Sequence, residues 1–263
     1  MTKKFLIAGN WKMNLNVTQA SLLVQRLSEK IPNHKDIEVV IAPTMLALQP
    51  ISVQLDHRKF KLASQDAYYK DEGAFTGQVS FTMLKNLVKY GIIGHSERRH
   101  IFGESLDDVT KKVAAAYRNN IIPILCVGET KTEKLAGETN QVIHDQVVTA
   151  LANVTSDDIA ELVIAYEPVW AIGTGDIATP DQASAIAKLI RNDISELYGA
   201  KVAKQVRILY GGSVKADVAS GFLRAPGING LLVGGASLNY QQFADIVAAT
   251  YRVAHNLHNK EDK

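Results

Sequence analysis

Eight short runs of apolar residues recur along this chain, and a helical pattern of apolar and polar positions follows each run. The runs begin at Phe5, Ile37, Phe60, Tyr90, Ile121, Leu162, Val206 and Gly230. Unbroken hydrophobicity over so few residues is typical of strands that are buried on both faces of a parallel sheet. The intervening patterns predict helices over residues 17–30, 45–57, 80–88, 105–119, 139–153, 180–198, 215–223 and 240–253.

The regular alternation of strand and helix predicts an α/β protein. It favours a closed (β/α)8 barrel, with eight parallel strands surrounded by helices, over an open doubly wound sheet. The 263 residues are 46% apolar and 21% charged, which suits one large domain that buries about three quarters of its unfolded surface. Because no linker-like composition divides the chain, we expect residues 1–263 to form one barrel domain, with a polar C-terminal tail from about residue 256.

The charge balance and the cysteine content exclude several classes of protein. A formal net charge of +2, from 29 basic and 27 acidic residues, leaves little field to hold a nucleic acid or an anionic membrane. The apolar run near the N-terminus is too short for a signal-peptide core, and no run approaches the length of a membrane span. The single cysteine, Cys126, cannot form an internal disulfide, and no Cys/His cluster has zinc-ligand spacing. These features predict a cytoplasmic, metal-free protein.

In a (β/α)8 barrel the loops that follow the strands build the active site, so the strand ends carry the candidate chemistry. After the first strand, Asn10 and Lys12 alternate onto one side, which suits an anionic or carbonyl substrate, although such a lysine can also be a solvated surface residue. After the fourth strand, His95 begins what looks like a short helix, whose positive end disfavours protonation of the ring. Local capping and catalysis both stay open for His95. Cys126 has apolar neighbours and no adjacent base, which indicates a buried packing residue.

The sixth strand ends at Glu167, and Pro168 and a glycine-closed apolar loop follow it. Pro168 fixes its own φ and pushes Glu167 toward extended geometry, while the glycines allow the far end of the loop to swing. This combination predicts a carboxylate base at the hinge of a lid, with Trp170 and Ile172 excluding water when the lid closes.

Two glycine pairs, Gly211-Gly212 and Gly234-Gly235, follow the last two strands. Either pair alone is typical of a plain turn. Together they occupy the place where barrels commonly bind phosphate, through backbone N–H groups and a helix N-terminus.

Five motifs stand in this chain in a fixed order. They are Asn-Trp-Lys-Met-Asn from Asn10, Gly-His-Ser-Glu-Arg-Arg from Gly94, Ala-Tyr-Glu-Pro-Val-Trp-Ala-Ile-Gly-Thr-Gly from Ala165, Tyr-Gly-Gly-Ser-Val from Tyr210 and Gly-Gly-Ala-Ser-Leu from Gly234. The single motifs are common, but with the whole set the sequence closely resembles the triosephosphate isomerase family, from about residue 4 to residue 251. The resemblance implies interconversion of dihydroxyacetone phosphate and D-glyceraldehyde 3-phosphate through an enediolate, with no cofactor and no metal.

The resemblance also implies a role for individual residues. Glu167 is the implied base, and neutral His95 hydrogen-bonds the substrate oxygens as negative charge develops. Lys12 and Asn10 hold the same oxygens, with Glu97 as a supporting carboxylate near Lys12. The N–H groups that are implied to cradle the phosphate belong to Gly173, Ser213, Gly234 and Gly235. The implied lid comprises Pro168, Val169, Trp170, Ala171, Ile172, Gly173, Thr174, Gly175, Asp176, Ile177 and Ala178.

The segment 66–79 is long for a loop between a strand and a helix. Long apolar loops usually cover an interface or a ligand, and the alternative is a loop folded over its own barrel. The resemblance makes this segment the contact of a homodimer, in which Thr76 reaches toward the active site of the partner subunit. The implied interface residues are Gln65, Gly73, Ala74, Phe75, Thr76 and Gly77.

One position departs from the family pattern, and two other functions stay open. Asp176 stands at the far hinge of the lid, where the family more often has lysine, which leaves the chemistry untouched and the lid kinetics open. A different phosphate-binding barrel, such as an aldolase that forms a Schiff base through Lys12, would need a similar cavity. A catalytically silent barrel acting as a scaffold would share the fold, although the intact set of Asn10, Lys12, His95 and Glu167 argues against it.

Overall fold

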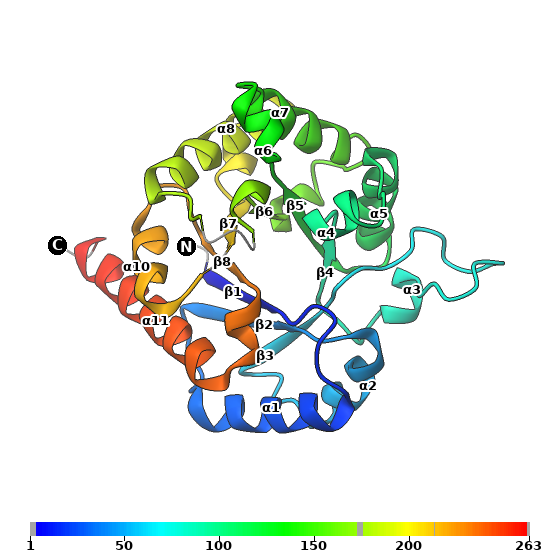
Figure 1. Cartoon of the computed structure of the whole chain (residues 1–263), viewed down its shortest axis with the longest axis vertical. Coiled ribbons are helices and arrows are strands. Elements are labelled where there is room, and N and C mark those ends of the chain that lie inside the picture. The colour runs from blue at the N-terminus through cyan, green and yellow to red at the C-terminus, as the bar shows by residue number, and fades with distance from the viewer. Residues whose placement is uncertain (1–3, 173–175, 213, 262–263) are drawn as a thin grey trace.

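The computed structural model describes residues 4–172, 176–212 and 214–261, and within these residues eight strands close into a barrel in chain order (Figure 1). The strands are β1 (Phe5–Asn10), β2 (Ile37–Ala42), β3 (Phe60–Ser64), β4 (Tyr90–Ile93), β5 (Ile122–Val127), β6 (Val163–Tyr166), β7 (Arg207–Gly212) and β8 (Gly230–Val233). Every neighbouring pair is parallel, and β8 closes the ring by pairing with β1, where Gly9 lies opposite Val233. The structure confirms the predicted fold class, and each strand begins within one residue of the predicted start.

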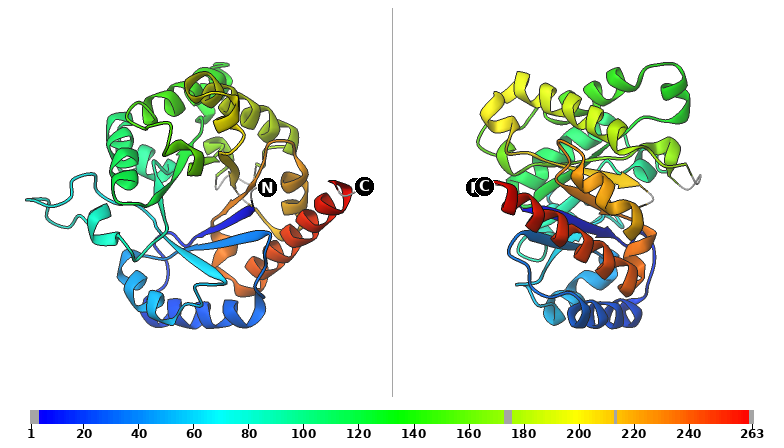
Figure 2. Two further views of the ribbon diagram at one scale, coloured as in Figure 1. Left: turned by 180° about the vertical axis from the view of Figure 1, so that it is seen from behind. Right: turned by 90° about the vertical axis from the view of Figure 1, so that its left-hand side faces the viewer.

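Helices surround the barrel (Figure 2). The α-helices are α1 (Val17–Lys30), α2 (Met45–Gln54), α3 (Phe81–Leu84), α4 (Ser96–His100), α5 (Leu106–Arg118), α6 (Lys131–Leu135), α7 (Thr139–Ala150), α8 (Pro180–Tyr198), α9 (Ala200–Ala203), α10 (Ala216–Arg224) and α11 (Tyr240–Glu261). The 3-10 helices are η1 (Ile159–Glu161), η2 (Val169–Ala171) and η3 (Gly235–Leu238). Within the described residues, no helix is both long and apolar enough to cross a membrane.

The eight predicted helices are present and differ from the prediction mainly at their ends, whereas α6, α9 and the three 3-10 helices were not predicted. The third helix stops at Leu84, because Lys85 is extended and Asn86 adopts a left-handed φ of 68°. The last helix was expected to end at Val253, but it continues to Glu261, so the polar tail expected from about residue 256 is helical over this part. No glycine or proline follows Val253 in this stretch, so nothing in the backbone stops the helix.

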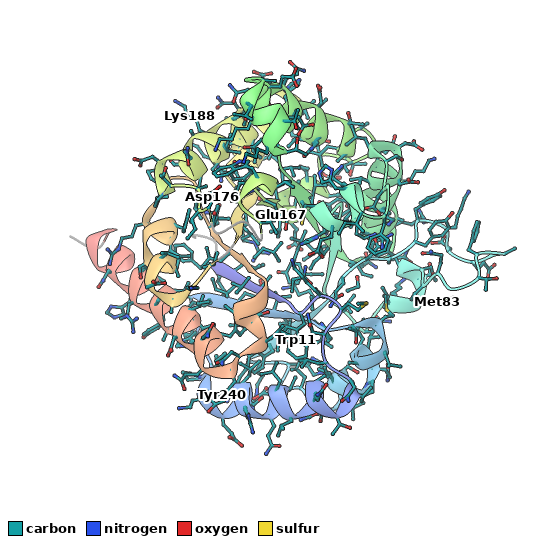
Figure 3. All side chains as sticks on the ribbon, viewed as in Figure 1. Trp11, Met83, Glu167, Asp176, Lys188 and Tyr240 are labelled. Carbon is teal, nitrogen blue, oxygen red and sulfur yellow. The ribbon has the colours of Figure 1, made fainter. Side chains whose placement is uncertain are left out.

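Alternation along the strands points one set of side chains into the barrel and the other toward the helices. The inner set forms a separate buried cluster of Leu6, Ala8, Val40, Ala42, Ala63, Tyr90, Ile92, Ile122, Ile124, Cys126, Val163, Ala165, Leu209 and Leu232. Side chains two residues apart in a strand point the same way, so Asn10 follows Ala8 and Glu167 follows Ala165 on the inner face. Asn10 and Glu167 therefore lie at the mouth of the barrel, and Glu167 is seen inside the ring of helices whereas Lys188 lies at its periphery (Figure 3).

A buried polar network closes the opposite end of the barrel, where the strands begin. Glu38 on β2 accepts a hydrogen bond from the hydroxyl of Tyr90 at 2.7 Å and pairs with Arg207 at 2.9 Å and with Lys89 at 2.6 Å. Arg207 also donates to the Tyr90 hydroxyl at 2.8 Å. Each charged group in this network therefore has a partner, as a buried charge requires. In barrels this end serves stability, so the chemistry is sought at the other end.

The segment 66–79, here called the arm, projects from the barrel between β3 and α3 (Figure 1). Its base is anchored by Asp71, which accepts hydrogen bonds from Arg118 at 2.9 Å and Thr82 at 2.8 Å. Aromatic packing stiffens it, because the ring of Tyr68 lies 4.7 Å from that of Phe75. The arm is therefore held away from the body, and the alternative of a loop folded over its own barrel is wrong.

Candidate active site

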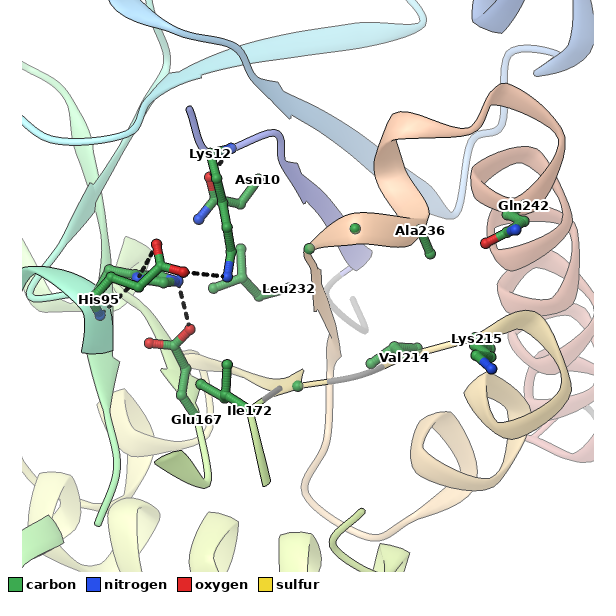
Figure 4. A pocket seen from close by; sticks show the side chains of 14 residues that line it. Asn10, Lys12, His95, Glu167, Ile172, Val214, Lys215, Leu232, Ala236 and Gln242 are labelled. Atoms are coloured by element: carbon green, nitrogen blue, oxygen red, sulfur yellow. Dashed lines mark hydrogen bonds and ion pairs between the residues drawn. The ribbon is translucent and has the colours of Figure 1, made fainter. Parts of the chain in front are cut away.

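A cavity of about 450 Å³ opens at the C-terminal end of the barrel (Figure 4). It is lined by Asn10, Lys12, His95, Glu97, Glu167, Ile172, Gly212, Val214, Lys215, Leu232, Gly234, Gly235, Ala236 and Gln242. All five predicted catalytic residues therefore meet in one cavity, together with two of the predicted phosphate-binding residues. The other two, Gly173 and Ser213, lie outside the described residues, as do Thr174 and Gly175 of the predicted lid.

Lys12 is held in an unusual backbone conformation at the cavity wall. Its φ is 52°, a left-handed value that costs free energy for any residue with a side chain. The Lys12 N–H donates to Asn10 Oδ1 at 3.0 Å, and Gln65 Nε2 donates to the Lys12 carbonyl at 2.8 Å. The same amide group of Gln65 donates to the Ala42 carbonyl at 2.9 Å, so the strained turn is tied to β2. Gln65, which the resemblance assigns to an interface, here supports the backbone of Lys12.

The ammonium of Lys12 forms an ion pair with Glu97 at 2.6 Å. Both side chains keep about a third of their surface exposed, at 30% and 35%, so the pair borders the open cavity. A nearby carboxylate holds the lysine in place while leaving its other N–H groups free to donate. This is the position that the resemblance implied for Glu97.

His95 occupies the N-cap of α4, and its two ring nitrogens have different partners. The Glu97 N–H donates to Nδ1 at 3.2 Å, which makes Nδ1 an acceptor and leaves the proton of a neutral ring on Nε2. Nε2 lies 3.0 Å from Glu167 Oε1. The capping role and the contact with the candidate base are thus both present, so the two predicted alternatives for His95 are compatible.

Glu167 is almost fully buried, with 4% of its surface exposed. Its Oε2 accepts a hydrogen bond from the Ser96 N–H at 3.1 Å. Gly211 makes room for the side chain, because a Cβ at this position would lie 3.0 Å from Glu167 Cγ. Gly211, the penultimate residue of β7, therefore shapes the site of the base, a function that the sequence did not indicate.

The His95–Glu167 contact shifts the pKa of both groups. Burial disfavours the charged ring of His95, but the charge and hydrogen bond of Glu167, with the charge of Glu97, outweigh it and raise the pKa of His95 above 6.5. Burial likewise disfavours the charged Glu167, but His95 and the Ser96 N–H outweigh it and lower the carboxyl pKa below 4.5. The lowered His95 pKa that the helix end suggested is not found in this arrangement, because Glu167 contacts the ring.

The hinge after Glu167 is fixed by contacts with Glu129. Trp170 Nε1 donates to Glu129 Oε1 at 2.7 Å, and the Tyr166 hydroxyl donates to the same oxygen at 3.1 Å. The ammonium of Lys134 lies 3.0 Å from the centre of the Trp170 ring. Trp170 therefore faces Glu129 rather than the cavity, and of the two residues predicted to exclude water, Trp170 and Ile172, only Ile172 lines the cavity.

Cys126 is fully buried among the inner side chains of the barrel. Burial, followed by the nearby charge of Glu167, raises its pKa well above 9.0. A thiol that resists ionisation is a poor nucleophile, which confirms the packing role predicted for it. Among the described residues, no group of three or more His, Cys, Asp or Glu side chains is arranged to hold a metal ion.

A second cavity of about 390 Å³ lies on the other side of Lys12 and His95. It is lined by Asn10, Lys12, Met13, Thr44, Met45, Gln65, Asp66, Ala67, Gly77, Gln78, Val79, His95, Glu97, Arg98 and Phe102. Large apolar side chains are exposed around it, with Met13 at 93% and Phe102 at 68% exposure. Exposed apolar surface of this kind marks interaction sites.

Comparison with known proteins shows which family this chain is similar to. The family model described as triosephosphate isomerase matches residues 5–250. A triosephosphate isomerase of Roseiflexus sp. (strain RS-1) is 47% identical over 243 residues, which covers 92% of this chain and 96% of that protein. The triosephosphate isomerases of Chloroherpeton thalassium and Clostridium tetani are 44% and 45% identical, and the matches cover 94% and 93% of this chain and 98% and 96% of theirs.

Proposed function

This chain belongs to the triosephosphate isomerase family, and we propose that it catalyses that family's reaction with Glu167 as the base and His95 and Lys12 as the electrophiles. The reaction interconverts dihydroxyacetone phosphate and D-glyceraldehyde 3-phosphate. A proton leaves the carbon beside the carbonyl and returns to the neighbouring carbon. The observation that supports the assignment of roles is the meeting of one buried carboxylate, one imidazole and one ammonium in a single cavity.

Glu167 is suited to the proton transfer because its lowered pKa keeps it ionised near neutral pH. A proton beside a carbonyl is a weak acid, and a positioned general base contributes roughly 10²- to 10⁴-fold to the rate of removing it. The same carboxylate is attached to the hinge through Pro168, so closure of the lid also sets its position. Glu167 then returns the proton to the adjacent carbon, and no other base is needed.

His95 and Lys12 stabilise the enediolate oxygens. The Nε2–H of His95 points toward Glu167 and the cavity, where a substrate oxygen would accept the same hydrogen bond. A cation about 4 Å from a developing anion contributes roughly 4 kcal/mol at an effective dielectric constant near 20. Asn10 is 5% exposed and positions Lys12 through its side-chain oxygen. Donors of this kind are worth roughly 10²- to 10³-fold in rate.

The phosphate site in this proposal lies at Gly234 and Gly235. A Cβ added to Gly234 would lie 3.6 Å from Lys12 Cε, and one added to Gly235 would meet no atom within 4 Å. The backbone is thus open to the cavity and close to the lysine, which allows N–H groups to approach a phosphate. Gly173 and Ser213 complete the cradle on the strength of their motifs alone.

Closure of the lid should protect the enediolate from water. Ile172 already lines the cavity, whereas Trp170 is bound to Glu129. We infer that Trp170 leaves Glu129 as residues 168–178 close over the substrate. Exclusion of water strengthens the electrostatic contacts and prevents loss of the phosphate from the intermediate.

The proposal includes a homodimer in the cytoplasm, where triose phosphates are metabolised. The arm and the second cavity lie on the same molecule, so a two-fold axis could place the arm of each subunit against the second cavity of the other. The residues that we assign to the interface are Gln65, Gly73, Ala74, Phe75, Thr76 and Gly77. The second cavity touches Lys12 and His95, so a partner's arm seated there would buttress the active site.

A coupled assay of triose-phosphate isomerisation tests this function. Turnover by the purified protein supports it, and its complete absence would favour a silent scaffold. A Schiff-base aldolase would become covalently labelled at Lys12 when borohydride is added with the substrate, whereas an isomerase would not. The three functions therefore give three different results.

A further inference from the structure

One cationic side chain in the active-site cavity, Lys215, has no role in the proposed mechanism. The described charged side chains that line the cavity are Lys12, Glu97, Glu167 and Lys215. Lys12 is paired with Glu97 at 2.6 Å, and Glu167 must be ionised to act as a base. Without Lys215 the formal charge of these side chains would be negative. A dianionic triose phosphate would then enter a site that repels it.

Lys215 stands at the far side of the cavity from the catalytic groups (Figure 4). It follows Val214, which is 3% exposed and anchored through a hydrogen bond from its N–H to the Gly212 carbonyl at 2.9 Å. The next residue, Ala216, begins α10. The backbone of Lys215 is therefore fixed by a buried neighbour and a helix, while its side chain is exposed at the cavity rim.

Within the described part of the chain, the side chain of Lys215 makes no other polar contact. Among the described residues, no ion pair or side-chain hydrogen bond involves its ammonium, and it does not cap α10 through its side chain. Gln242, the other polar side chain at this end, is exposed as well. Lys215 and Gln242 line the same cavity as Gly234 and Gly235, the two glycines at which the proposed function places the phosphate.

We propose that Lys215 is a positioning residue that attracts the substrate's phosphate dianion into the cavity and increases its affinity there. This inference rests on the proposed function, and it adds a side-chain cation to a cradle otherwise built of backbone N–H groups. Lys215 brings the formal charge of the four described charged side chains from −1 to zero and places a cation at the far side of the cavity. Charges in a cleft act strongly on an approaching ion, and salt weakens the effect. Lys215 takes no part in proton transfer, because it lies across the cavity from Glu167.

The experiment compares Lys215→Gln, Lys215→Glu and Lys215→Arg with the control Lys188→Gln. Lys188 is an exposed lysine on α8, so its substitution changes the net charge equally without touching the cavity. At low ionic strength, Lys215→Gln should lower kcat/KM for the triose phosphates about three- to tenfold, with the loss carried by KM, and Lys215→Glu should lower it further. Lys215→Arg should retain most of the wild-type value. The difference between K215Q and wild type should nearly vanish at about 1 M salt, where the screening length is about 3 Å.

Two further measurements separate this inference from the proposed function. Binding of inorganic phosphate, followed by calorimetry, should weaken about three- to tenfold in K215Q and not in K188Q, a result that needs no turnover. Glyceraldehyde, which lacks a phosphate, should be isomerised equally by wild type and K215Q. Equal phosphate affinity and equal salt dependence in K215Q and K188Q would overturn the role of Lys215, whereas lack of turnover by the wild type would overturn the function.

Discussion

Replacing Glu38 by Gln should show how much the buried polar network, at the end of the barrel where the strands begin, stabilises the fold. Burial opposes the charge of Glu38, but hydrogen bonds from Lys89, Arg207 and Tyr90 outweigh it and lower the carboxyl pKa from 4.5 to about 2. One pKa unit corresponds to about 1.4 kcal/mol, so the shift is worth roughly 3 kcal/mol of folding free energy. The Lys89 side chain is 42% exposed and partly screened by water, so we expect roughly 2 to 3 kcal/mol.

The sign of this contribution fixes its pH dependence. A carboxyl whose pKa is lowered by folding stabilises the folded state above its unfolded pKa, and the stabilisation is lost as the pH falls through the folded pKa. Here the loss should run from pH 4.5 down to about pH 2. At pH 7, E38Q should therefore lower the free energy of unfolding by roughly 2 to 3 kcal/mol, and at about pH 2.5 the difference from wild type should fall below roughly 1 kcal/mol.

Urea unfolding followed by circular dichroism, with wild type and variants at the same protein concentration, measures this difference. Glu196→Gln, at an exposed position on α8, is the control for losing a carboxylate that has no part in the network. The reasoning would be refuted by an E38Q deficit no larger than that of the control at pH 7. A deficit of the same size at both pH values would also refute it.

Three other changes test the active site and the arm. Glu167→Gln should lower kcat roughly 10²- to 10⁴-fold while phosphate affinity persists, because the base acts only in the chemical step; near-normal kcat in steady-state kinetics would overturn its role. Glu129→Gln weakens the charged acceptor of Trp170 and Tyr166, so the indole N–H of Trp170 should exchange faster with solvent in NMR experiments, and unchanged exchange would contradict the hinge contact. Deleting residues 73–77 should give monomers with weak activity, and an unchanged dimer mass in light scattering would exclude this interface.

The architecture was predictable because buried parallel strands leave a strong local pattern. Each strand of the barrel is covered on both faces, so its run is mostly apolar, and the eight runs lie where the strands do. Glu38, Lys61 and Arg207 are charged exceptions. The same logic located the candidate site, since Asn10 and Glu167 continue the inner alternation of their strands. The structure brings these residues into one cavity, and their catalytic roles stay a proposal.

The contacts within the site could not be derived from the sequence. Glycine 94 has a φ of 68°, which ends the alternation of β4, so the direction of His95 cannot be counted from the strand. Trp170 turns to Glu129 because a buried carboxylate, 1% exposed, needs donors, and only the fold shows that the two are neighbours. Lys215 has no local pattern that distinguishes it from a solvated lysine. These features depend on tertiary contacts between distant parts of the chain, and a periodic pattern does not record them.

The contact between His95 and Glu167 implies that the pKa of the His95 ring differs between the empty site and the substrate-bound site. While Oε1 lies 3.0 Å from Nε2, the carboxylate raises the pKa of His95. In the proposed mechanism a substrate oxygen takes the Nε2–H and a substrate carbon faces the carboxylate, which moves the negative charge away from the ring. Burial and the Glu97 N–H at Nδ1 then dominate, and both favour the neutral ring. Binding of a triose-phosphate analogue should therefore lower the His95 pKa in an NMR titration, and a rise on binding would contradict this exchange of partners.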